Sequence, residues 1–171
     1  AGLSRGLGDV YKRQDLDIAI QGVIDGMRYT RQGQACTAGS RVYIQEKIYD
    51  KVINGAVEKL SKLKMGNALD EGSDIGAIIS EEQLKRTLHY MDIAKQTSSA
   101  KVVHGGNQPT GGDYKNGFFY EPTLMSGVPV DSPVCQEEIF GPVACAIPFK
   151  TFEEVMQSAN DTPCLLYTSD A

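Results

Sequence analysis

The sequence has few residues that could bind a structural metal ion. Only two histidines and four cysteines occur among its 171 residues. The cysteines (Cys36, Cys135, Cys145 and Cys164) form no CxxC pair. Structural zinc needs four closely spaced ligands, so we expect no metal site. Disulfide frameworks are typical of small secreted chains, and no charged-then-apolar leader opens this sequence. We therefore expect free thiols and a cytoplasmic protein.

Basic residues and long apolar runs are also scarce. There are 17 Lys and Arg against 22 Asp and Glu, which gives a formal net charge of −5. Binding to nucleic acid needs a clustered excess of basic residues, because phosphates must be neutralised. The longest apolar stretch, around residues 143–149, is far shorter than the ~20 residues of a membrane-spanning helix. We expect neither nucleic acid nor a membrane among the partners.

Helical and strand-like patterns alternate along the chain. Apolar residues at helical spacing predict helices over 15–31 and 46–64, and β-branched or aromatic runs predict strands over 41–45, 100–104, 118–124 and 143–149. Glycines and prolines between 105 and 117 predict a turn-rich surface loop. This alternation indicates an α/β layered fold, with a largely parallel sheet flanked by helices.

Two capping boxes predict two further helices. Residues 80–83 (SEEQ) and residues 151–154 (TFEE) both have the pattern in which the first side chain caps the helix and the fourth bonds back. The second of these helices has Phe152, Val155, Met156 and Ala159 at helical spacing. These four residues are expected to share one face of the helix.

The segment over residues 31–41 contains the strongest candidate for chemistry. Cys36 lies there among glycines and small polar residues, between a predicted helix and a predicted strand. Such neighbours leave the thiol accessible. A thiolate attacks carbonyl carbon well, and the main-chain N–H of Cys36 can stabilise the oxyanion that this attack produces. A buried cysteine acting as a small apolar residue is the alternative, since free cysteines are often buried. For Cys135 and Cys145, which lie in or beside apolar stretches, that structural role is the better interpretation.

No histidine is connected to Cys36 by the sequence. His89 lies beside the apolar face of a predicted helix, and His104 ends a predicted strand. A cysteine hydrolase needs an adjacent imidazole, so the pattern does not favour one. An unpaired thiol can still act on a reactive aldehyde, if a base comes from elsewhere.

Four segments occur in the order in which one enzyme family has them. They are residues 32–41 (QGQACTAGSR), 117–124 (GFFYEPTL), 136–143 (QEEIFGPV) and 159–163 (ANDTP), and residues 15–19 (DLDIA) precede them. Together they resemble motifs of the NAD(P)-dependent aldehyde dehydrogenases. The resemblance implies that residues 15–163 are an internal fragment of that family's catalytic domain.

The resemblance implies roles for five side chains. Cys36 is the expected nucleophile, which forms a thiohemiacetal and then a thioester. Glu138 is expected to accept hydrogen bonds from the nicotinamide ribose, and Phe140 to pack near the nicotinamide ring. Gln83 and Arg86 fall where the family has further ribose contacts, but an exposed helix face explains these two equally well.

The sequence also departs from the family. Residues 1–14 and 164–171 match none of its motifs, so we expect both to be non-native tails. The family's general-base glutamate, oxyanion-hole asparagine and pyrophosphate loop belong upstream of residue 15. We therefore expect the parent, a homo-oligomer, to oxidise an aldehyde to a carboxylic acid with NAD or NADP, and this chain to be inactive by itself. A catalytically silent scaffold that keeps the family fold is the alternative.

Overall fold

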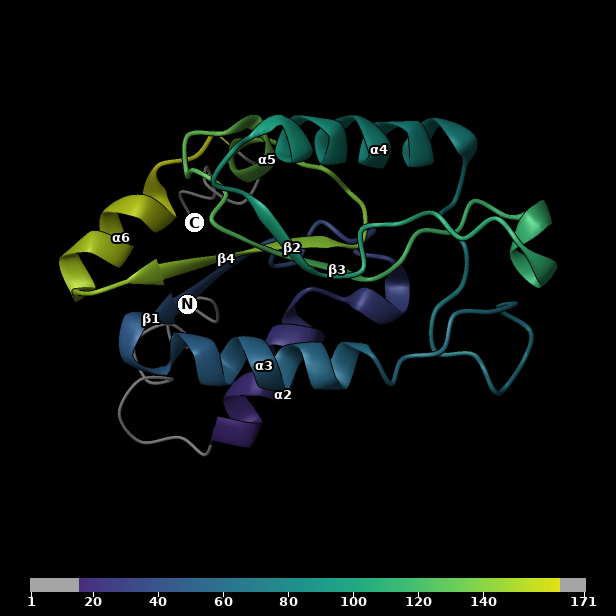
Figure 1. The fold of residues 1–171 in the computed structure, drawn as a ribbon, viewed down its shortest axis with the longest axis horizontal. Coiled ribbons are helices and arrows are strands. Elements are labelled where there is room, and N and C mark those ends of the chain that lie inside the picture. The colour runs from purple at the N-terminus through teal and green to yellow at the C-terminus, as the bar shows by residue number, and fades with distance from the viewer. Residues whose placement is uncertain (1–15, 164–171) are drawn as a thin grey trace.

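The described part of the chain is built around one four-stranded sheet (Figure 1). The computed structural model describes residues 16–163, so the predictions about both terminal segments, 1–14 and 164–171, lie outside it. The strands lie in the order β1-β4-β3-β2. β4 pairs in parallel with both β1 and β3, and only β2 is antiparallel to its neighbour β3, so the predicted largely parallel sheet is confirmed. The strands are β1 (Arg41–Gln45), β2 (Lys101–His104), β3 (Thr123–Ser126) and β4 (Val143–Phe149).

Helices cover both faces of the sheet, which gives three layers (Figure 1). α2 (Leu16–Gly26) and α3 (Tyr49–Leu60) pack below the sheet in this view, and α4 (Glu81–Gln96) and α5 (Pro133–Gln136) lie above it. α6 (Phe152–Asn160) follows β4, and residues 16–163 also contain three short 3₁₀ turns: η1 (Tyr29–Arg31), η2 (Glu46–Ile48) and η3 (Gly112–Asn116). None of the helices in the described part is long and apolar enough to cross a membrane.

β4 holds the layers together because its side chains alternate between the two faces of the sheet. Val143, Cys145 and Ile147 belong to the core beneath α4 and α5, while Ala144 and Ala146 belong to the core against α2 and α3. A strand buried on both faces reads as a continuous apolar run, as β4 does.

Both capping boxes start helices where the sequence predicts them. The Ser80 hydroxyl accepts a hydrogen bond from the Gln83 amide at 3.2 Å, at the start of α4. The Thr151 hydroxyl accepts one from the Glu154 amide, also at 3.2 Å, at the start of α6. These caps are local, and the sequence is therefore sufficient to predict them.

Two predicted helices are shorter than expected. The helix predicted over 15–31 ends at Gly26, because Arg28 adopts a left-handed conformation with φ 58°. The chain then turns inward, so that the buried Tyr29 hydroxyl donates to the Thr123 carbonyl at 2.8 Å. The helix predicted over 46–64 is a 3₁₀ turn followed by α3, which ends at Leu60.

Two other details differ from the prediction, and the face predicted for the last helix is only partly covered. The strand predicted over 118–124 begins only at Thr123, because Pro122 has no N–H to donate to a neighbouring strand. α5 was not predicted. The apolar face of α6 is only partly buried: Val155 is covered, but Phe152 and Met156 are 59% and 40% exposed.

Candidate active site

Cys36 lies in a partly exposed loop between η1 and β1. This cysteine loop (residues 32–39) is closed by hydrogen bonds from the Ala38 amide to the Ala35 carbonyl and from the Gly39 amide to the Gly26 carbonyl. Cys36 itself is exposed. The sequence left a buried structural cysteine open as an alternative, and the structure excludes it.

Cys135 and Cys145 have the structural role that the sequence predicts. Both thiols are buried and unoxidised, in the core between the sheet and α5. The hydrogen bond that the two thiols share, together with burial, holds the pKa of Cys145 well above its ordinary value. Cys145 is therefore a neutral thiol with little nucleophilic character.

The difference in exposure predicts a difference in alkylation rate. Iodoacetamide is expected to label Cys36 more than about tenfold faster than Cys135 or Cys145, because reaching a buried thiol requires a local opening of a few kcal/mol. Peptide mapping of a time course measures all three rates in one sample. Labelling of Cys36 at the rate of the two buried cysteines would contradict its assignment as an accessible nucleophile.

A second element of the site is the glutamate segment (residues 137–141), which lies between α5 and β4. Glu138 and Phe140 are both half-buried. Phe140 has φ 56°, a left-handed conformation that is rare for an aromatic residue. Strained backbone of this kind persists only where the surroundings impose it, and it clusters at functional sites.

The cysteine loop and the glutamate segment are packed backbone to backbone. Gly33, at φ +65°, is so close to the carbonyl of Gly141 that a Cβ atom at Gly33 would overlap it. Gly141 in turn is so close to α4 that a Cβ there would overlap the side chain of Thr87. Glycine is needed at both positions because these three segments meet without room for a side chain.

Gln83 and Arg86 of α4 contact the glutamate segment. The Gln83 side-chain amide nitrogen donates to the carbonyls of Ile139 and Phe140, both at 2.8 Å. Arg86 donates to the Glu138 carbonyl from Nη2 at 2.6 Å and from Nε at 3.1 Å. The structure thus brings together four of the residues that the sequence singled out, and their roles toward a cofactor stay predictions.

Sequence analysis missed a third residue of α4, Tyr90. Its hydroxyl donates to Glu137 Oε2 at 2.6 Å, and Arg86 Nη2 donates to the same hydroxyl at 3.3 Å. The only sequence signal is spacing, because Gln83, Arg86 and Tyr90 recur every three or four residues and so share one helix face.

Neither histidine contacts Cys36. His89 is exposed on α4, and burial lowers the pKa of the half-buried His104 on β2. Among residues 16–163, no three His, Cys, Asp or Glu side chains gather in a group that could hold a metal ion. The described residues therefore present an exposed thiol and a glutamate segment, without a Cys–His pair.

Comparison with known proteins identifies the family of this chain. The model of the aldehyde dehydrogenase family matches residues 9–169. The D-glyceraldehyde dehydrogenase (NADP(+)) of Picrophilus torridus is 40% identical over 154 residues, which are 90% of this chain and 30% of that protein. The betaine aldehyde dehydrogenase of Bacillus subtilis is 35% identical over 153 residues, again 90% of this chain, and 31% of that protein.

Solved structures of the same kind share the fold. The betaine aldehyde dehydrogenase of Staphylococcus aureus, solved in complex with NAD+, superposes with a TM-score of 0.82 at 36% identity, over 86% of this chain and 29% of that one. The NAD+ complex of an aldehyde dehydrogenase from Bacillus cereus gives 0.80 at 34% identity, over 88% and 30%. The chain thus spans about 30% of the length of these relatives. It belongs to the aldehyde dehydrogenase family.

Proposed function

We propose that this chain supplies the nucleophile and the nicotinamide side of the active site in an enzyme that oxidises an aldehyde to a carboxylic acid with NAD or NADP. One observation carries the proposal: the exposed thiol of Cys36 is on a loop packed directly against the glutamate segment. The relatives support it, since one is named for NADP(+) and two were solved with NAD+.

Cys36 performs the covalent chemistry in this proposal. Its thiolate attacks the aldehyde carbon and forms a C–S bond, and the carbonyl oxygen takes the negative charge. In this proposal the Cys36 N–H stabilises that oxyanion by donating a hydrogen bond to it. When the oxyanion collapses, hydride leaves the same carbon, and the acyl group stays on Cys36 as a thioester until water releases it.

Glu138 and Phe140 have the right chemistry to hold the cofactor. A bound nicotinamide cofactor supplies the acceptor for the hydride. The Glu138 carboxylate can only accept hydrogen bonds, which suits the two hydroxyls of a ribose, and it makes no hydrogen bond to any residue that the structure describes. The half-buried Phe140 offers an aromatic surface at the other end of the same segment, which can pack against a nicotinamide ring.

The proposal is tested by a graft. In the graft, residues 16–163 replace the matching span of the Bacillus subtilis betaine aldehyde dehydrogenase. The other 69% or so of the grafted enzyme is the Bacillus subtilis sequence. The graft is expected to reduce NAD or NADP in the presence of a short-chain aldehyde, measured by absorbance at 340 nm. A folded graft that binds cofactor and aldehyde without any turnover would contradict the proposal and favour the silent scaffold.

The 171-residue chain by itself is the matched comparison. It is expected to show no sustained turnover, because a positioned general base contributes about 10²–10⁴-fold and the Cys36 thiol has no hydrogen-bond partner among the described residues. The same absorbance assay measures it. Multiple turnovers by the isolated chain would show that the rest of the parent is dispensable.

A cytoplasmic location and a homo-oligomeric parent remain predictions from the sequence and the family resemblance.

A further inference from the structure

Three side chains of α4 (Gln83, Arg86 and Tyr90) bind the glutamate segment by hydrogen bonds from one side. This set of contacts is called the grip below. Gln83 and Arg86 together donate four hydrogen bonds to the carbonyls of residues 138–140. Arg86 also lies over the ring of Tyr90, with its guanidinium carbon 5.5 Å from the ring centroid. The four hydrogen bonds join residues more than 50 positions apart in the sequence.

The grip distinguishes two neighbouring glutamates. The carboxylate of Glu137 is held by the Tyr90 hydroxyl at 2.6 Å, so this side chain is directed toward α4. At Glu138 it is the main-chain carbonyl that faces α4, where Arg86 binds it twice. The Glu138 carboxylate is therefore left available for a ligand.

The grip also accounts for the left-handed conformation of Phe140. In an extended chain, consecutive carbonyls point to opposite sides. Here one amide nitrogen of Gln83 binds the carbonyls of Ile139 and Phe140 together, so both must face α4. The positive φ of Phe140 permits this arrangement.

We propose that Arg86, supported by Gln83 and Tyr90, is a positioning residue, which fixes the direction of Glu138 and Phe140 without touching the cofactor. The effect of Arg86 on the reaction rests on the proposed function. The grip itself is a property of this chain and can be tested without any cofactor.

The first test measures order in the segment. Arg86→Ala in the 171-residue chain is expected to lower the ¹⁵N order parameters of the Glu138 and Phe140 amides from about 0.85 to below about 0.6, while those of β4 stay unchanged. Arg86→Lys, whose donors are all on one nitrogen, is expected to give order parameters between those of the unsubstituted chain and those of Arg86→Ala. Unchanged order parameters in the segment, or an equal fall in β4, would overturn the proposal.

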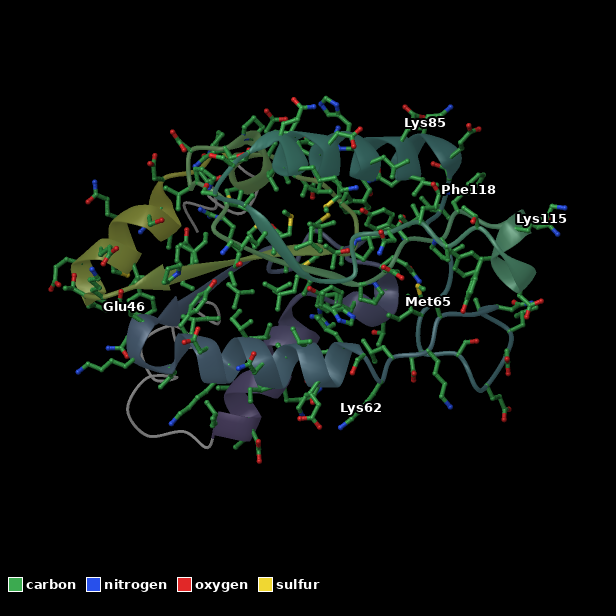
Figure 2. All side chains as sticks on the ribbon, viewed as in Figure 1. Glu46, Lys62, Met65, Lys85, Lys115 and Phe118 are labelled. Atoms are coloured by element: carbon green, nitrogen blue, oxygen red, sulfur yellow. The ribbon has the colours of Figure 1, made fainter. Side chains whose placement is uncertain are left out.

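Lys85→Ala is the matched control, since Lys85 lies on the outer side of α4 (Figure 2). Lys85 forms an exposed ion pair with Glu81 at 2.7 Å, one turn away. The substitution removes the same kind of charge from the same helix. It is expected to leave the order of the glutamate segment as it is.

The second test measures the effect on the reaction in the graft. Arg86→Ala is expected to raise KM for the cofactor about tenfold, with kcat per active site little changed. Arg86→Lys is expected to restore part of the affinity for the cofactor. Lys85→Ala is expected to have the same kcat and KM as the unsubstituted graft. A residue that only stabilises the fold would reduce the number of active sites and leave KM alone, which would overturn the proposal. If the unsubstituted graft is inactive, the proposed function fails, and the order parameters still decide whether the grip exists.

Discussion

Replacing Cys36 by alanine in the graft is expected to abolish aldehyde oxidation, with a loss of about 10⁴–10⁶-fold in kcat. The thiol forms the covalent bond that holds the substrate while hydride leaves, and an alanine offers no nucleophile in its place. Steady-state absorbance with saturating aldehyde and cofactor measures the loss. Retained activity at a tenth or more of the unsubstituted graft would refute the mechanism.

Two further substitutions make this result specific. Thr37→Ala removes an exposed side chain from the same loop and is expected to keep the activity, which excludes a general disturbance of the loop. Glu138→Gln is expected to lower kcat/KM for the cofactor by only about 10- to 100-fold, because a charged hydrogen bond of about 1.5–3 kcal/mol is weakened while the nucleophile remains. Equal losses for Cys36→Ala and Glu138→Gln would show that these two residues do not have separate roles.

The features that the sequence predicts are those with local causes. The caps at Ser80 and Thr151 depend on side chains within three residues, and β4 is apparent because both of its faces are buried. The exposure of Cys36 follows from its small polar neighbours within the same loop. Sequence analysis therefore located the sheet, the main helices and the candidate nucleophile.

The features that it missed depend on tertiary contacts. The left-handed conformation of Arg28 ends α2 early and lets Tyr29 bond to Thr123, 94 positions further on. Similarly, Tyr90 reaches Glu137 across 47 positions, and nothing in the local pattern of α4 indicates that partner. One sequence without the fold can suggest that Gln83 and Arg86 are functional, but it cannot show which carbonyls they bind.

The close packing of the cysteine loop on the glutamate segment predicts a large effect of Gly33→Ala on stability. We expect the free energy of unfolding to fall by about 2–5 kcal/mol, because the added Cβ strains a residue at φ +65° and also overlaps the Gly141 carbonyl. The overlapped atom belongs to the backbone, so a change of rotamer cannot relieve the contact. Urea denaturation followed by circular dichroism measures the change.

Gly22→Ala is the control for this prediction, because it makes the same substitution where there is space. Gly22 lies within α2, and a Cβ atom there would meet nothing within 4 Å. An alanine inside a helix is favoured over glycine, so this variant is expected to gain about 0.5–1 kcal/mol. If Gly33→Ala were as stable as the unsubstituted chain while Gly22→Ala gained stability as expected, the cysteine loop could not be packed on the glutamate segment. Cys36 and Glu138 would then have no fixed positions relative to each other, and the packing on which the proposed site depends would be absent.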